Sequence, residues 1–310
     1  MVNILVTGAA GFIASAIAGR LAEDAGNHVV IVDNLMSGSM KKVPVSRHKN
    51  ISFIKGDVND LSEISAVFKE TPFDFVFHYA ATVGVQRTLL HPVKVLDDIE
   101  GLKNILNLSR SSGVKHIYYS SSSEVYGEPV QIPQNEHTTP LNSRMPYAIV
   151  KNLGEAFLRV YQSEYGLDYT VFRFFNTYGP LQSDDFVISK FMQAATKHEP
   201  ITIYGDGSQT RTFCYIDDNT DCCEKIFRDR LHVNDVINIG SAIEISILEL
   251  ARMIIRMTGS RSEIVHKPPL PEGDMTRRKP DIAKMDAVMQ RPLITLEEGL
   301  QKILKAGRNS

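Results

Sequence analysis

A glycine turn between a strand and a helix, at the start of the chain, constrains the fold more than any other sequence feature. Residues 3–7 form a short apolar run with β-branched members, which predicts a buried strand. Gly8 and Gly11 follow, and a helical pattern of apolar residues then continues through Ile17 and Leu21. Gly8 permits a tight turn, and Gly11 lets backbone N–H groups approach a pyrophosphate at the start of the helix. Strand, glycine turn and helix in this order predict a dinucleotide-binding fold.

A second strand and the acid that ends it indicate which dinucleotide binds. Residues 28–32 are rich in Val and Ile, and Asp33 follows them, 22 residues past Gly11. A carboxylate at this place accepts hydrogen bonds from the ribose hydroxyls of adenosine and repels the additional phosphate of NADP. We therefore expect NAD as the cofactor. The alternative, a structural glycine turn followed by a solvated Asp33, does not account for the complete order of elements.

Strands and helices alternate through the first half of the chain. Strand patterns occupy residues 51–55, 73–78, 116–120 and 169–174, and helical patterns occupy residues 61–69, 97–111 and 146–165. This alternation predicts an α/β fold with a Rossmann-like, doubly wound parallel sheet and helices on both faces.

The alternation breaks beyond residue 176. A strand pattern at 236–239, helical patterns at 246–257 and 296–304, and a proline-rich loop at 267–273 are recognisable there. We expect an NAD-binding domain over residues 1–175, which also carries the catalytic residues. A smaller α/β lobe over residues 176–310 is expected mainly to bind substrate, with some segments returning to the main sheet.

Composition excludes several classes of function. The net charge of −2, without a basic run, argues against nucleic acid as a partner. No apolar stretch is long enough to span a bilayer, so we expect no membrane contact. The chain enters a strand at once, so we expect no signal peptide and a cytoplasmic location. Cys214, Cys222 and Cys223 fit neither a disulfide framework nor a metal site, and we expect core or half-buried thiols.

Tyr147 and Lys151 are the clearest candidates for chemistry. They lie four residues apart, and so on one face of the helix predicted at 146–165. A free phenol titrates near pH ~10, and a neighbouring ammonium lowers its pKa, so the pair predicts a general base that works near neutral pH. A serine run at 120–123 ends a predicted strand. A hydroxyl there can face the tyrosine across the cleft, bind a substrate oxygen and pass a proton to Tyr147.

These segments together resemble the extended short-chain dehydrogenase/reductase family. The resemblance rests on the motif of residues 7–13, Asp33, Gly56-Asp57-Val58, Tyr79-Ala80-Ala81, the serine run with Val125-Tyr126-Gly127, and Tyr147 with Lys151. Residues 173–180 and 204–211 are similar to the nucleotide-sugar branch of that family, the NAD-dependent epimerases and dehydratases, and the similarity continues to residues 277–282.

The resemblance implies a role for each matching residue. It makes Ser122 the catalytic hydroxyl, Tyr147 the base and Lys151 the residue that holds the nicotinamide ribose. The implied NAD contacts are Gly8, Gly11, Phe12, Ile13, Asp33, Asn34, Asp57, Val58, Ala80, Ala81, Tyr147, Lys151 and Phe174. The implied contacts to the sugar nucleotide are Arg87, Ser122, Ser123, Glu124, Tyr147, Asn176, Arg211 and either Arg277 or Arg278. Arginine suits a diphosphate because its planar fork binds phosphate oxygens in pairs. No metal is expected.

Enzymes of this branch share oxidation at C4 of the sugar and differ in the fate of the 4-keto sugar. An epimerase returns hydride to its other face. A UDP-glucuronate decarboxylase forms a β-keto acid that loses carbon dioxide, and a 4,6-dehydratase uses a Glu and an Asp to remove water. Ser123-Glu124 stands where dehydratases have Asp-Glu, which disfavours dehydration. A non-catalytic binder of NAD and a sugar nucleotide would usually lack Ser122, Tyr147 or Lys151.

Other segments distinguish epimerases from decarboxylases. Residues 209–211 and 278–281 are similar to decarboxylases. The loop at 82–88 is similar to epimerases, however, and lacks the proline-rich stretch and tyrosine that decarboxylases place near the sugar carboxylate; Leu181 stands where they often have Arg. We therefore expect an NAD-dependent 4-epimerase acting on a UDP-hexose, UDP-N-acetylhexosamine or UDP-hexuronate, with a UDP-glucuronate decarboxylase as the alternative.

The resemblance implies two further features. Relatives commonly dimerise through the Tyr147 helix and the helix before it, so we expect a homodimer. Asp98 and Leu102 stand where relatives usually have Asn and Thr. An ionised Asp accepts hydrogen bonds but donates none, so a contact near the strand at 116–120 is expected to differ in this chain.

Overall fold

A seven-stranded parallel sheet forms the centre of the molecule. The computed structural model describes residues 1–84, 88, 92–269 and 275–307. The strand order is β11-β6-β5-β4-β1-β2-β3, and each neighbouring pair is parallel. The strands are β1 (Val2–Thr7), β2 (Asn27–Asp33), β3 (Ile51–Lys55), β4 (Phe75–His78), β5 (His116–Ser122), β6 (Asp168–Phe174) and β11 (Asp235–Ile239). The expected α/β fold with a doubly wound parallel sheet is confirmed.

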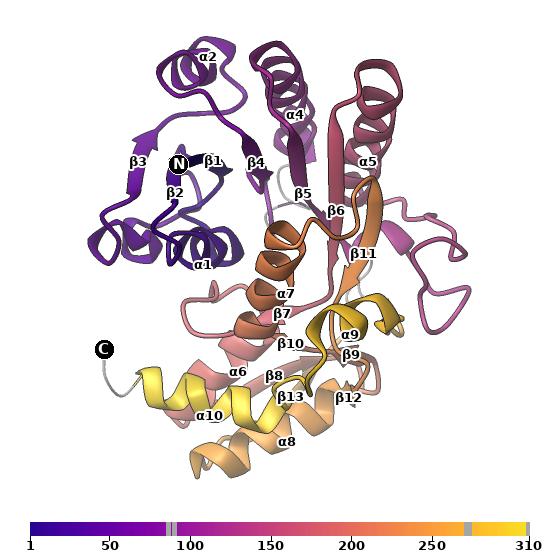
Figure 1. Cartoon of the computed structure of the whole chain (residues 1–310). Coiled ribbons are helices and arrows are strands. Elements are labelled where there is room, and N and C mark those ends of the chain that lie inside the picture. The colour runs from indigo at the N-terminus through magenta and orange to yellow at the C-terminus, as the bar shows by residue number, and fades with distance from the viewer. Residues whose placement is uncertain (85–87, 89–91, 270–274, 308–310) are drawn as a thin grey trace.

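Helices cover both faces of the sheet (Figure 1). One face carries α2 (Leu61–Glu70), α4 (Pro92–Ser112) and α5 (Pro146–Tyr165), and the other carries α1 (Phe12–Leu21), α7 (Ile216–Arg228) and α9 (Ala283–Met289). Successive residues of a strand point to opposite faces, so Ile4 and Val6 of β1 join the core under α1 while Leu5 joins the core under α2 and α4. Three short 3₁₀ helices, η1 (Met40–Lys42), η2 (Pro44–Ser46) and η3 (Ser123–Tyr126), lie in loops after β2 and β5.

A second, smaller layer lies beneath the carboxyl ends of the strands (Figure 1). Its helices are α6 (Val187–Thr196), α8 (Ile247–Thr258) and α10 (Leu296–Gly307). Its strands form pairs, namely β7 (Thr177–Tyr178) with β10 (Cys214–Tyr215), β8 (Ile201–Tyr204) with β13 (Ile264–Lys267), and β9 (Thr210–Thr212) with β12 (Glu244–Ser246). A separate apolar core holds this layer together. The boundary between two domains at residue 175 stays a prediction. Strand β11, which follows that boundary in the chain, lies in the central sheet.

The structure differs from the expected elements mainly after residue 176. The sequence patterns did not predict α6, α7 and α9. Helices α6 and α9 are short, with 10 and 7 residues, whereas α7 has 13 residues and its amphipathic pattern was missed. Lys267, expected in a loop, ends β13, an edge strand that is mostly exposed and therefore lacks an alternating pattern. In the first half, α4 begins at Pro92, five residues before the expected start, because proline is tolerated in the first turn of a helix.

The three cysteines are free and buried, as expected. Within the described part of the chain, no helix combines the length and the apolar character that a bilayer-spanning segment needs.

Candidate active site

A cavity of about 320 Å³ lies where the strands of the central sheet end. Its wall on the sheet side is built from residues at or just after the ends of six strands, among them Gly8, Asp33, Gly56, Tyr79, Ser122 and Phe174. The smaller layer closes the other side with Tyr178, Phe213 and Arg278. The cavity therefore lies at the carboxyl ends of parallel strands, which is where doubly wound sheets bind ligands.

The turn at one end of this cavity can be formed only with glycine at two positions. Gly8 has φ +73°, and a Cβ there would lie 2.7 Å from the backbone N and Cα of Ala80. A Cβ on Gly11 would lie 2.9 Å from the carbonyl oxygen of Gly8. Phe12 and Ile13 begin α1 directly after the turn and line the cavity. The first backbone N–H groups of α1 are thus close to the cavity, where they favour an anion such as a pyrophosphate.

Asp33 is fixed beside the glycine turn by the backbone. Its Oδ2 accepts a hydrogen bond from the Ala10 N–H at 2.9 Å, and its Oδ1 accepts one from the Leu35 N–H at 2.7 Å. A carboxylate has about four acceptor sites, so two contacts leave capacity for ribose hydroxyls. Asn34 donates from Nδ2 to Asp57 Oδ2 at 2.9 Å, which joins the ends of β2 and β3 at the cavity.

Apolar residues make the walls between these polar groups. Val58, Ala80, Ala81 and Phe174 all line the cavity. Thus each residue expected to contact the dinucleotide lies at the cavity, apart from Lys151, which is buried behind Tyr147 and is only 3% exposed.

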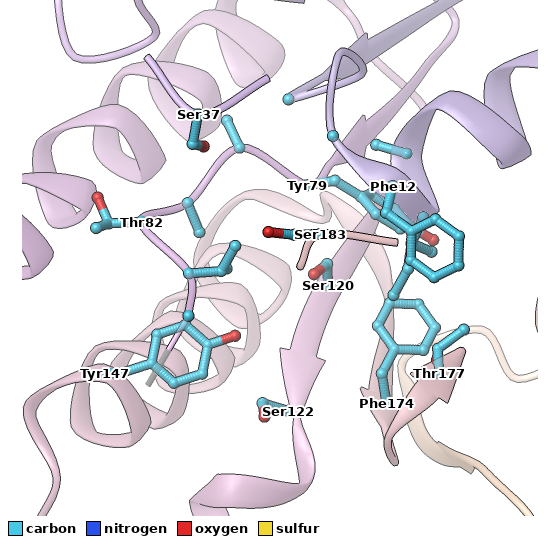
Figure 2. A pocket seen from close by; sticks show the side chains of 18 of the residues that line it. Phe12, Ser37, Tyr79, Thr82, Ser120, Ser122, Tyr147, Phe174, Thr177 and Ser183 are labelled. Atoms are coloured by element: carbon cyan, nitrogen blue, oxygen red, sulfur yellow. The ribbon is translucent and has the colours of Figure 1, made fainter. Parts of the chain in front are cut away.

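Tyr147 and Ser122 approach the cavity from different elements (Figure 2). Pro146 opens α5, which places Tyr147 in the first turn of that helix. Ser122 ends β5, and its Oγ accepts a hydrogen bond from the Glu124 N–H at 3.2 Å, capping η3. The Ser122 hydroxyl is near enough to the phenol to oppose the rise in the pKa of Tyr147. Both hydroxyls line the same cavity, as a proton relay between them requires.

The pKa of Tyr147 differs from the expectation. Burial raises the pKa of Tyr147 well above its ordinary value, and the negative charge of Glu124 adds to the rise. Lys151 Nζ lies 5.8 Å from the centre of the Tyr147 ring and 5.0 Å from that of Tyr119. Burial lowers the pKa of Lys151 itself to about 8. The expected lowering of the Tyr147 pKa by Lys151 is therefore wrong. Burial raises that pKa because desolvation disfavours the charged form, and the groups that oppose the rise are Ser122 and Arg278.

Arg278, rather than Arg277, faces the cavity. Arg278 lines it, its Nη1 lies 3.8 Å from Glu124 Oε1, and its buried Nε has no hydrogen-bond partner among the described residues. Arg277 instead makes two hydrogen bonds of 2.6 Å to Glu244, outside the cavity lining. A buried N–H without a partner costs free energy, so the Arg278 guanidinium is the one prepared for a ligand oxygen.

The other expected substrate contacts separate into three groups. Ser123, Glu124 and Asn176 line the cavity. Arg211 is buried but lies outside the lining, and its Nη1 donates to the carbonyl of Thr210 at 2.7 Å. Arg87 lies outside the described residues.

The cavity also contains residues that the sequence patterns did not indicate. Lys42, Gln182 and Phe186 line it. They come from irregular loops or their ends, where no periodicity marks an inward-facing side chain. Asp98 also lines the cavity, and only its departure from the usual residue of the resembled family drew attention to it.

Comparison with known proteins points to one family. Residues 4–240 match the model of the NAD dependent epimerase/dehydratase family. A putative UDP-glucose 4-epimerase of Methanocaldococcus jannaschii is 32% identical over 312 residues, covering 99% of each chain. UDP-glucuronic acid decarboxylase 1 of Danio rerio is 33% identical, covering 98% of this chain and 72% of the relative. The solved UDP-glucose 4-epimerase of Thermotoga maritima, with UDP-glucose, is 32% identical and has a TM-score of 0.91 over 99% of each chain.

Proposed function

The chain belongs to the NAD-dependent epimerase/dehydratase family, and from this premise we propose that it is a UDP-sugar 4-epimerase that works through a transient 4-keto sugar. Relatives that are UDP-sugar epimerases and decarboxylases support an NAD-dependent enzyme acting on a UDP-sugar. The observation that carries the proposal is that Ser122 and Tyr147 line the same cavity as the glycine turn with Gly8 and Gly11.

The residues at the glycine turn fit NAD. Gly8 and Gly11 permit a turn that a Cβ would obstruct, because it would overlap the backbone of Ala80 or of Gly8, and the start of α1 favours the pyrophosphate. Asp33 has acceptor capacity left for the adenosine ribose. When bound, NAD supplies the acceptor for the hydride from sugar C4 and the donor that returns it.

Tyr147 and Ser122 handle the proton in this proposal. The C4 hydroxyl gives its proton to Tyr147, either directly or through Ser122, as C4 becomes a ketone. Tyr147 must therefore be a phenolate before this step and a phenol after it, and the phenol returns the proton when the ketone is reduced. The raised pKa of Tyr147 favours the phenol that the oxidation leaves. Arg278 carries a positive charge that favours the phenolate during the oxidation.

Charge at the sugar end of the cavity favours a neutral sugar. Glu124 lines the cavity, and its negative charge reaches Tyr147. The cations among the described lining residues are Lys42 and Arg278, and Arg278 already faces Glu124. A carboxylate on the sugar would be repelled by Glu124 and would have to compete for Arg278. We therefore favour a UDP-hexose or a UDP-N-acetylhexosamine over a UDP-hexuronate.

A UDP-glucuronate decarboxylase is the second candidate. The free Nε of Arg278 supports it, because that N–H can bind a carboxylate if Glu124 turns away. The identity to the Danio rerio decarboxylase supports it equally.

Product analysis separates the two candidates. The protein is incubated separately with UDP-glucose, UDP-N-acetylglucosamine and UDP-glucuronate, and the nucleotides are resolved by chromatography and mass spectrometry. The proposal predicts a C4 epimer of unchanged mass from at least one of the first two. UDP-xylose with released carbon dioxide, and no epimer, would identify the protein as a decarboxylase instead.

We also propose that the protein is a homodimer. Ile149, Leu153 and Val160 form an exposed apolar stripe along α5, and Val93 and Leu96 are exposed on the neighbouring α4. Exposed apolar residues on one helix face indicate a surface that is covered by a partner.

A further inference from the structure

Asp98 joins α4 to the loop after β4 at the rim of the cavity. Its Oδ2 accepts a hydrogen bond from the Thr82 N–H at 2.7 Å, and its Oδ1 accepts one from the Thr82 hydroxyl at 3.2 Å. Thr82 is 3% exposed, and its side chain is one of those shown lining the cavity (Figure 2). Both Asp98 and Thr82 line the cavity. The carboxylate is therefore held in one orientation within the site.

The charge of Asp98 acts on Lys151. Helices α4 and α5 pack side by side (Figure 1), and Lys151 is buried between α5 and the sheet. Burial lowers the pKa of Lys151 to about 8, and the negative charge of Asp98 opposes that change. Conversely, burial raises the pKa of Asp98, and the hydrogen bonds from Thr82 and the charge of Lys151 oppose the rise. Each group thus favours the ionised form of the other.

We propose that Asp98 is a positioning residue whose negative charge holds Lys151 as an ammonium ion beside Tyr147, while its two oxygens fix Thr82 at the rim of the cavity. The inference deepens the proposed function, and it rests on that function only in taking Tyr147 as the base. An ammonium at Lys151 matters because the neutral amine would no longer favour a phenolate at Tyr147.

Four described ionisable groups face Asp98. Lys151 and Tyr147 lie on α5, Tyr119 on β5, and Asp97 on α4 itself. Asp98 raises the pKa of Lys151 and also that of Tyr147. Removing its charge is therefore expected to lower the pKa of both groups.

The direct test follows the titration of Lys151 in the complete protein. Lysine side chains are labelled with ¹³C at Cε, and the Lys151 resonance is identified by its loss in Lys151→Arg. Asp98→Asn removes the charge but keeps the size of the side chain and an oxygen that accepts from the Thr82 N–H. We expect the Lys151 midpoint to fall by about one pH unit in this variant, as for loss of a nearby opposite charge.

Three control variants separate charge from structure. Asp97→Asn removes an exposed charge from the same helix, Thr82→Val removes the hydroxyl contact, and Asp98→Glu keeps the charge. All three should leave the Lys151 midpoint within a few tenths of a pH unit of the unmodified protein. An unchanged midpoint in Asp98→Asn, or an equal shift in Asp97→Asn, would overturn the proposal.

The unmodified protein provides a test that needs no variant of Asp98 to fold. The proposal requires an ionised Asp98, so its ¹³C carboxyl resonance must show the carboxylate shift at pH 7. A titration midpoint of Asp98 above pH 7 would contradict it.

The pH dependence of turnover gives the functional readout. Both limbs of the kcat/KM profile should move to lower pH in Asp98→Asn, because the pKa values of Tyr147 and Lys151 fall together. A purely structural role would lower kcat/KM at every pH without displacing the limbs. The titration of Lys151 is measured without turnover. Its result therefore stays valid even if the protein proves not to be an epimerase.

Discussion

Tyr147 is a buried phenol that lines the cavity with Ser122, and its pKa depends on burial and on neighbouring charges. Tyr147→Phe keeps the ring but removes the group that exchanges the C4 proton. We expect kcat to fall by about 10²- to 10⁴-fold, the usual contribution of a general acid or base. The dissociation constant for the UDP-sugar, from calorimetry, should change little.

Tyr161→Phe is the matched control on the same helix. Its hydroxyl donates to Asn107 at the surface and lies outside the cavity lining. Turnover should stay near that of the unmodified protein. Equal losses in the two variants would remove Tyr147 from the proposed chemistry.

The adjacent arginines offer a second comparison at the residue scale. Arg278→Met should weaken binding of the UDP-sugar by about 10- to 100-fold, because a charge-assisted hydrogen bond contributes about 1.5–3 kcal/mol. Arg277→Met breaks a half-exposed ion pair with Glu244 and should change binding by less than about threefold. Calorimetric titration with the UDP-sugar measures both, and a larger effect at Arg277 would reverse the assignment.

Helix α5 is the element that positions Tyr147 and Lys151, and Gly154 sets how closely it approaches β5. A Cβ on Gly154 would overlap the hydroxyl of Tyr119. Gly154→Ala should therefore displace α5 from the sheet, destabilise the protein by about 1–3 kcal/mol and reduce turnover.

Gly19→Ala on α1 is the control for Gly154→Ala. A Cβ there would meet only Pro44, at 3.7 Å, which is ordinary contact. That substitution should stabilise the protein by about 0.5–1 kcal/mol, because alanine favours helix over glycine. Urea unfolding gives the free energy of unfolding of both variants. A more stable Gly154→Ala variant would show that a Cβ fits between α5 and Tyr119, contrary to the prediction.

The sequence alone predicted the elements that have a long apolar periodicity or a complete motif. Helix α5 has such a periodicity, and the segment from β1 to α1 has a complete strand, glycine turn and helix. The site around Gly8 and Asp33 was therefore predictable from contiguous residues. Helix α6 follows an irregular segment, and α7 begins directly after the two-residue strand β10; neither was predicted.

Features that depend on tertiary surroundings could not be predicted from the sequence. Arg277 and Arg278 are neighbours of one residue type, and only the position of Glu244 shows which of them faces away. The pKa of Tyr147 depends on burial, which no local pattern reports.

At the scale of the whole molecule, the apolar stripe on α5 predicts a dimer. Val160→Asp places a charge in that stripe, and light scattering should then give the mass of a monomer where the unmodified protein gives twice that mass. Val130→Asp substitutes an exposed valine away from α4 and α5 and should leave the dimer intact. A monomeric unmodified protein would contradict the proposal.

Two buried histidines predict how stability depends on pH. Burial lowers the pKa of His78 and of His116 to about 3. Each folded-state pKa lies below the unfolded value of about 6.5. Below about pH 6.5 the unfolded state therefore binds more protons than the folded state does. Each histidine should then destabilise the fold by about 1.4 kcal/mol per pH unit between about pH 6 and pH 3.

His116→Gln isolates one of these contributions. Urea unfolding at pH 7 and pH 5 should show a smaller loss of stability in the variant than in the unmodified protein. An equal loss in both would mean that His116 takes up a proton within the fold.

The proposed mechanism depends on reversible oxidation of the sugar at C4, and an isotope label reports on that step most directly. UDP-glucose or UDP-N-acetylglucosamine carrying deuterium at C4 is converted in ordinary water, and the product is examined by ¹H and ²H NMR. The mechanism predicts a product with inverted configuration at C4 that still carries the deuterium there, because the abstracted hydride returns to the same carbon. An epimer that has lost the C4 deuterium to solvent, or has inverted at another carbon, would contradict it.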